Sequence, residues 1–211
     1  MSIDRNLGIE QKLKTEEEYA ERILNLADIA FEQKEDYKTA LNNAFKSVTE
    51  RISPAKRKEV LKHVHGLNLY NYVFQVAEYK NEQRKDKAGI YKYPESEDFD
   101  EAWKFVMSAE SKKLPRDIKD QVIDIAWVNV LADLVANAME DGKTFIDACK
   151  QVFAEEGEDK LDYKEITSAI GSILGKRGST KKEILKRQQV AAAEERKKYP
   201  LIAEMEKSDR I

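Results

Sequence analysis

The sequence predicts an all-α protein, a multi-helix bundle with about eight or nine helices in two packed groups and no sheet. Two observations favour this fold class. Helix breakers are scarce, with 8 glycines and 4 prolines in 211 residues, whereas average proteins hold about 7% glycine and 5% proline. Apolar side chains also recur at three- and four-residue spacing, and no stretch alternates with the two-residue period of a strand.

The first three predicted helices each begin at a recognisable N-cap. The run Thr15-Glu16-Glu17-Glu18 is a capping box, in which the threonine and the last glutamate each accept a hydrogen bond from the other's backbone N–H. Asp36 caps the second helix, and Ser53-Pro54 gives the third an N-cap followed by proline. Because glycine commonly follows the last residue of a helix, Gly66 is expected to end the third one.

The next helix is expected to be buried, and a linker is expected after it. Apolar residues cover most of the helix circumference in residues 67–84, which predicts a helix surrounded by its neighbours. Residues 85–98 have no helical period and contain Gly89 and Pro94. We therefore expect an N-terminal helical bundle in residues 1–86 and a C-terminal helical region, with a basic terminal helix, in residues 95–211.

The C-terminal region shows further helical patterns. A short helix is expected near residues 99–109, with Trp103 on its apolar side. Leu114-Pro115 opens the longest apolar helix, which is expected to end at Asp141-Gly142. The predicted N-caps of the remaining helices are Thr144, then Asp162 in a second capping box, and Ser179 or Thr180.

Composition excludes several classes of protein. A single cysteine, Cys149, allows no internal disulfide and fits a reducing compartment. The N-terminus shows no apolar stretch of a signal peptide, and no apolar run of 18 residues that could span a bilayer is found. We therefore expect a soluble cytoplasmic protein that does not contact a membrane.

The residues that usually carry chemistry do not form a catalytic or metal-binding pattern. His63 and His65 are the only histidines, and two residues apart on a helix they point to different faces. Residues 154–165 resemble an EF-hand loop, but Ala154 stands where the first ligand belongs and Asp159 where the turn glycine belongs. Cys149 lies on an apolar stripe, as expected of a small buried side chain. We expect no enzyme activity, no cofactor and no metal.

The run at residues 175–182, Gly-Lys-Arg-Gly-Ser-Thr-Lys-Lys, is the most informative part of the chain. A helix N-terminus carries about half a positive charge, so each lysine in the first turn of the predicted last helix costs about 0.3–1 kcal/mol. Residues 176–198 hold nine basic residues against three acidic ones, a local net charge of +6 in a chain of −3. A bound anion would account for both features.

Part of this run, Gly175-Lys176-Arg177-Gly178, resembles the glycine loop of KH nucleic-acid-binding domains. In that family a Gly-x-x-Gly loop joins two helices and clamps the backbone of a few nucleotides. The resemblance implies that Lys176 and Arg177 occupy the two middle loop positions. It covers about a dozen residues, and the sequence shows no counterpart of the KH sheet. The chemistry of the loop is therefore implied, and the KH fold is not.

Two other interpretations of the run stay open. The helices expected on either side of residues 175–179 would form a helix-turn-helix, although that motif usually has a turn of about 3–4 residues. Alternatively, Gly175 ends a helix, Gly178 belongs to a turn and the cations are solvated.

The charge pattern predicts a non-enzymatic accessory or regulatory protein that binds DNA, RNA or another polyanion. The predicted contacts are the basic residues of the run and of the helix after it: Lys176, Arg177, Lys181, Lys182, Lys186 and Arg187. The alternative function is that of a helical adaptor or assembly subunit, whose surface of mixed charge binds another protein.

Overall fold

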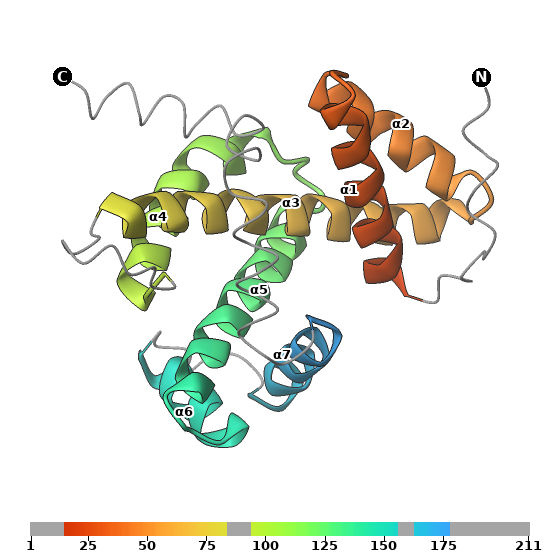
Figure 1. Ribbon diagram of the computed structural model, residues 1–211. Helices are drawn as coiled ribbons and strands as arrows, with labels where there is room; N and C mark the ends of the chain where they lie inside the picture. Colours follow the sequence, from red (N-terminus) through yellow and green to blue (C-terminus); the bar gives the residue numbers. More distant parts are fainter. Residues whose placement is uncertain (1–14, 84–93, 156–162, 178–211) are drawn as a thin grey trace. The chain divides into compact units, whose positions relative to one another are not determined.

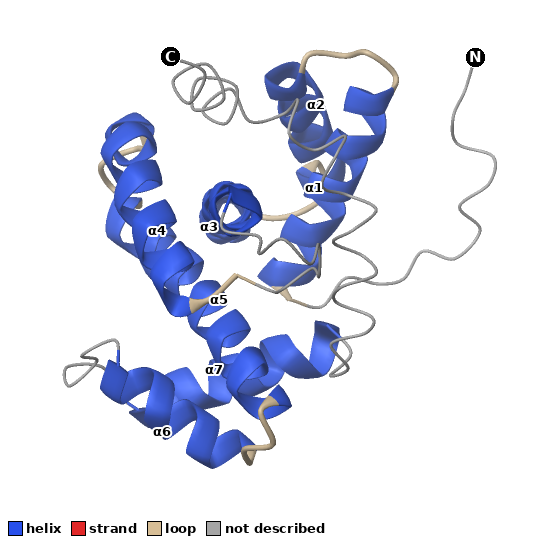
Figure 2. Cartoon of the chain, turned by 60° about the vertical axis from the view of Figure 1, so that its left-hand side comes forward, coloured by secondary structure: helices blue, strands red, loops and turns tan. Residues whose placement is uncertain are grey.

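The computed structural model describes residues 15–83, 94–155 and 163–177. These residues form seven α-helices and one short 3-10 helix, with no strand among them (Figures 1 and 2). The all-α prediction is confirmed, with slightly fewer helices than expected. The chain forms two compact units, residues 1–64 and residues 65–211, which divide within one continuous helix. Most of the predicted linker lies outside the described residues.

The first unit contains α1 (Glu16–Glu32), α2 (Tyr37–Thr49) and the beginning of α3 (Pro54–Gln83). Helices α1 and α2 pack along each other (Figure 1). Small side chains are prominent among the residues they bury, which include Ala20 and Ala27 on α1 and Ala40 and Ala44 on α2. Because alanine has no side chain beyond Cβ, these positions allow helix backbones to approach closely.

The three predicted N-caps of this unit are confirmed. Thr15 N–H donates to the Glu18 carboxylate at 3.0 Å, and Glu18 N–H donates to the Thr15 hydroxyl at 3.2 Å. The Asp36 carboxylate accepts from the third residue of α2 at 3.0 Å, and the Ser53 hydroxyl accepts from the third residue of α3 at 3.3 Å. Each cap satisfies a backbone N–H that has no partner within its helix.

The second unit contains the rest of α3, α4 (Ser96–Glu110), the 3-10 helix η1 (Ser111–Lys113), α5 (Lys119–Glu140), α6 (Phe145–Glu155) and α7 (Tyr163–Arg177). Helix α5 packs against both α6 and α7. The largest side chains that are almost wholly buried in this unit include Phe99, Leu131, Phe153 and Ile170. The predicted burial of residues 67–84 is confirmed for most of residues 67–81.

The expected helix end at Gly66 is wrong, because α3 continues from Pro54 to Gln83 without a break. A Cβ built on Gly66 would lie 2.5 Å from Cγ2 of Ile125 and 3.3 Å from the Val122 carbonyl oxygen. Glycine is needed here because α3 and α5 approach each other more closely than any larger residue allows. This continuity merges two of the predicted helices and lowers the helix count.

The boundaries of α4 and α5 differ from the predicted ones by a few residues. Helix α5 begins at Lys119, after a turn in which Ile118 N–H donates to the Pro115 carbonyl at 3.2 Å. Helix α4 begins at Ser96, inside the predicted linker, because the Asp98 carboxylate caps the backbone N–H of Glu95 at 3.0 Å.

Other predicted helix ends of the second unit are confirmed. Gly142 follows the end of α5 with φ +90°, a conformation that glycine adopts without strain. The Thr144 hydroxyl accepts from Asp147 N–H at 3.3 Å at the start of α6. The predicted cap at Asp162 and the predicted last helix after Ser179 lie outside the described residues.

Helix α5 is long and apolar enough to cross a membrane by length and composition alone, which the sequence prediction did not anticipate. Its most apolar 18-residue window has a mean hydropathy of 1.5, and 56% of that window is buried within the protein. The core helix of a globular bundle has the same properties, so this is weak evidence for a membrane span. Two polar residues of α5, Asn129 and Asp133, are also buried.

Candidate nucleic-acid interface

The predicted interface begins on the last turn of α7. Four apolar residues with helical spacing anchor this helix in its unit, and all four are buried: Ile166, Ile170, Ile173 and Leu174. Gly175 and Lys176 follow them and are exposed, and Arg177 is the last described residue of α7. The first residues of the basic segment 176–198 therefore belong to a helix that packs within the second unit.

The described residues place only part of the predicted site. Gly178 and four of the six predicted contacts, Lys181, Lys182, Lys186 and Arg187, lie outside them. Gly175, Lys176 and Arg177, which the resemblance to KH domains places in a loop, are helical. Apart from its own helix backbone and chain neighbours, none of the described residues has an atom within 4 Å of a Cβ built on Gly175, so packing among them does not require glycine there.

Lys176 and Arg177 lie within α7, so the argument from unfavourable lysines in the first turn of a helix does not concern them. It concerns only Lys181 and Lys182, which lie outside the described residues.

The second unit also contains a buried polar contact that the sequence reasoning missed. The Tyr70 hydroxyl on α3 donates to Oδ2 of Asp133 on α5 at 2.6 Å, and Asp133 is 0% exposed. A short hydrogen bond to a carboxylate is among the stronger ones in proteins. The available signal was a carboxylate flanked by Ala132 and Leu134 in the most apolar helix, where an acid requires a partner.

Two other polar side chains of α5, the buried Asn129 and the half-buried Asn137, donate hydrogen bonds to backbone carbonyls. The Asn129 side chain donates to the carbonyl of Ile125 at 2.8 Å, one turn earlier in α5. The Asn137 side chain donates to the carbonyl of Pro94 at 3.0 Å and ties the chain before α4 to α5. The Asn137 contact therefore joins two parts of the unit, whereas the Asn129 contact lies within α5.

Burial alters the titration of several groups. Desolvation, with a smaller contribution from Glu110, raises the pKa of Tyr72 to about 12. Desolvation lowers the pKa of His65 and raises that of the Cys149 thiol. Cys149 is buried and its thiol stays protonated at neutral pH, in agreement with the predicted small core side chain.

The candidates for metal binding and acid–base chemistry give no site in the described part of the chain. No group of three or more His, Cys, Asp or Glu there is arranged to hold a metal ion. Desolvation first, and then the charge of Asp120, raise the pKa of Asp124 near the start of α5.

The two tryptophans of the chain contact each other. Trp103 and Trp127 pack together with ring centroids 4.7 Å apart.

No protein-family model matches the chain, and neither the curated proteins nor the solved structures that were compared with it gave a match.

Proposed function

We propose that the protein is a non-enzymatic cytoplasmic accessory protein that binds nucleic acid through residues 176–198. One observation carries the proposal: these residues have a net charge of +6, whereas the rest of the chain has −9. A polyanion releases condensed counterions when cations neutralise its phosphates, so such a segment binds it largely without regard to base sequence. Lys176, where the segment begins, is exposed on α7, which supports access by a large ligand.

The test is the quadruple variant Lys176→Glu, Arg177→Glu, Lys181→Glu and Lys182→Glu. The matched control reverses four exposed cations elsewhere, Lys104, Lys112, Arg116 and Lys150, and therefore changes the net charge equally. Affinity for labelled DNA and RNA, single- and double-stranded, is measured by fluorescence anisotropy at several salt concentrations. Six phosphate contacts predict a slope of about −5 in a plot of log K against log salt for duplex DNA.

We expect the quadruple variant to lose binding and the control to keep most of it, with unchanged helicity in both. Equal loss in the two variants would mean that only net charge matters, and wild-type affinity in the quadruple variant would reject the site. Failure of the wild-type protein to bind at low salt would reject the function. A stoichiometric protein partner that resists nuclease treatment would then favour the adaptor.

Two glycine variants separate contact through a loop from contact through a helix. If bare main chain at the Gly-x-x-Gly sequence holds phosphates, Gly178→Ala should weaken binding, because a Cβ hinders their approach. Gly175→Ala should leave binding unchanged, because Gly175 is helical and its surroundings are open. Equal weakening by both substitutions would favour a loop that includes Gly175.

A further inference from the structure

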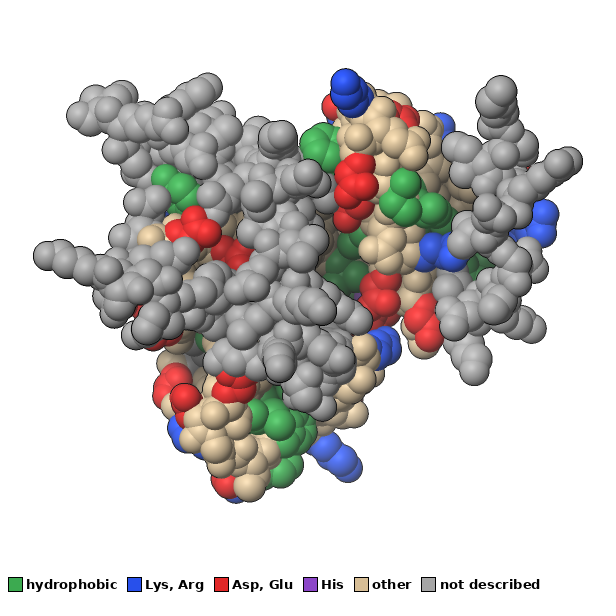
Figure 3. All heavy atoms as spheres, in the orientation of Figure 1, with side chains coloured by type: hydrophobic (Ala, Val, Ile, Leu, Met, Phe, Trp, Pro, Cys, Tyr) green, Lys and Arg blue, Asp and Glu red, His purple; other side chains and the backbone are tan. Residues whose placement is uncertain are grey.

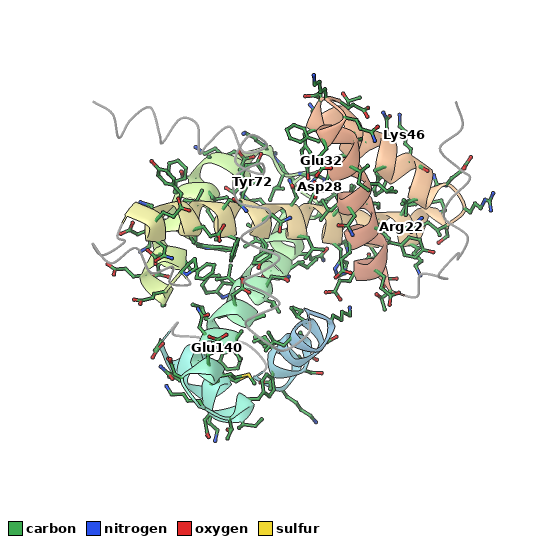
Figure 4. The ribbon with its side chains drawn as sticks, in the orientation of Figure 1. Arg22, Asp28, Glu32, Lys46, Tyr72 and Glu140 are labelled. Atoms are coloured by element: carbon green, nitrogen blue, oxygen red, sulfur yellow. The ribbon has the colours of Figure 1, made fainter. Side chains whose placement is uncertain are left out.

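The first unit separates its charges between consecutive segments. Residues 15–36, which contain α1, hold eight acidic residues and two basic ones. Residues 37–64, which contain α2 and the first turns of α3, hold seven basic residues and two acidic ones. Acidic side chains lie along the visible face of α1 in Figure 3, and Figure 4 places Asp28 and Glu32 on α1 and Lys46 on α2. A surface with one sign of charge attracts ligands of the opposite sign.

Helix α2 differs from every other described α-helix because it contains no acidic residue. Lys38, Asn42 and Lys46 follow one another at four-residue spacing, and all three are exposed. The buried residues Ala40 and Ala44 lie on the other side of the helix. The helix dipole accounts for Lys46, which lies in the last turn of α2, but it disfavours Lys38 in the first turn, and asparagine is a poorer helix former than glutamate. Lysine and asparagine are, however, common donors to phosphate oxygens.

Three other cations of the basic residues 37–64 lie on α3 and have contacts within the unit. Lys56 lies 3.7 Å from a Glu16 carboxylate oxygen, and Lys62 lies 2.7 Å from a Glu59 carboxylate oxygen. The Arg57 guanidinium donates to two backbone carbonyls in the turn between α2 and α3, at 3.1 and 2.6 Å. These contacts give Lys56, Arg57 and Lys62 a local role, and none of them involves the α2 stripe.

We propose that the outer face of α2, formed by Lys38, Asn42 and Lys46, is a second contact surface for the phosphate backbone of a nucleic acid. A rise of 1.5 Å per residue separates the two lysines by about 12 Å along the helix axis. One strand of duplex DNA presents a phosphate about every 3.4 Å along its axis, so the lysines meet phosphates about three or four steps apart. Asn42, between them, donates to a phosphate oxygen.

The inference that this surface binds a nucleic acid rests on the proposed function. The surface itself lies in the first unit, whereas residues 176–198 belong to the second. It provides charge and hydrogen-bond donors without a base-reading pattern, so it contributes affinity rather than sequence preference. Arg51, exposed in the turn that follows α2, extends the same positive charge. The surface therefore gives the protein a second electrostatic contact that is independent of residues 176–198.

The test compares Lys38→Glu/Lys46→Glu with Lys104→Glu/Lys150→Glu in the full chain. All four lysines are exposed and helical, and each pair changes the net charge equally. Anisotropy titrations use labelled duplex DNA, single-stranded DNA and RNA at several salt concentrations. Loss of two phosphate contacts should make the salt slope for duplex DNA less steep by about 1.8, at about 0.9 per contact. The control pair should keep the wild-type slope.

A milder variant, Lys38→Gln/Lys46→Gln, removes the charges with a residue of similar helix propensity. It should reduce the slope by the same amount, with wild-type circular dichroism. If the wild-type protein binds and this variant has the same slope of log K against log salt as the wild type, the α2 surface is rejected. The C-terminal assignment is not affected by that result. Loss of binding here, with binding kept in the C-terminal quadruple variant, would reject the C-terminal site instead. No binding by the wild-type protein would reject both.

Discussion

The α1–α2 contact of the first unit and the α3–α5 contact of the second are built in different ways. The first buries small apolar side chains between helices whose N-termini are capped on the exposed surface. The second depends on Gly66, which meets Ile125 closely, and on the buried hydrogen bond between Tyr70 and Asp133. We therefore expect stability to be spread over many positions in the first contact and concentrated in a few in the second.

The comparison can be measured because both tryptophans, Trp103 and Trp127, belong to the second unit. Tryptophan fluorescence during urea unfolding reports on that unit, whereas far-ultraviolet circular dichroism reports on the helices of both units. Two probes with different midpoints would show that the units unfold separately.

The largest effect is expected for Tyr70→Phe. This change removes the hydroxyl that donates to the buried Asp133 carboxylate, and a buried acceptor that loses a donor costs about 1–3 kcal/mol. The urea midpoint from tryptophan fluorescence should fall accordingly. Tyr19→Phe, at a half-buried position of α1, is the control; measured by far-ultraviolet circular dichroism, which also reports on the first unit, it should change stability by less than about 0.5 kcal/mol. Equal effects of the two changes would remove the proposed difference between the contacts.

Gly66→Ala should have the next largest effect. Overpacking costs about 1–3 kcal/mol, and the better helix propensity of alanine offsets about 1 kcal/mol of it. Gly175→Ala is the matched control, because Gly175 is also helical but nothing lies near its Cβ position. The same substitution should therefore destabilise α3 and stabilise α7, by less than about 1 kcal/mol in α7. Urea unfolding measures both, and shifts of equal sign would contradict the close approach of α3 to α5.

The caps of the first unit should each contribute less. Thr15→Ala and Asp36→Ala remove side-chain acceptors at the starts of α1 and α2, at a cost of about 1 kcal/mol each. Circular dichroism should report the change. Thr15→Ser and Asp36→Asn keep an acceptor and should stay close to wild type. If either cap substitution lowers the free energy of unfolding as much as Tyr70→Phe does, the stability of the first unit also depends on single positions.

The smallest effect is expected from His65. Desolvation lowers its pKa in the folded protein, so between that value and the unfolded value near 6.5 the unfolded chain binds more protons. Stability should therefore fall as the pH decreases below about 6.5 and should be unaffected above it. His65→Gln should flatten this dependence in urea titrations monitored by tryptophan fluorescence. An identical pH dependence in the variant would show that other groups cause it.

Local features of the fold were predictable because they involve neighbouring residues. The caps at Thr15, Asp36, Ser53 and Thr144 join groups three residues apart, so the sequence contains both partners. Gly66 was misinterpreted because a glycine that ends a helix and one that allows two helices to touch look the same in a sequence.

The candidate sites show the same division. Basic composition alone singles out residues 176–198 as a candidate contact segment. The placement of Lys176 in a packed helix, rather than in a loop, depends on how far α7 extends, and α7 is described as far as Arg177. The α2 stripe was not recognised from the sequence, because the exposure of Lys38, Asn42 and Lys46 on one side of α2 is a property of the folded unit.

The sequence by itself determined that this protein is helical, where most of its helices begin, and which segments are acidic or basic. Each of these properties follows from neighbouring residues and from side-chain charge. Only the tertiary structure decided that α3 passes through Gly66 and that Tyr70 meets Asp133, 63 residues away. Contacts between distant residues depend on how closely helices pack, and that distance is set by all the side chains between them.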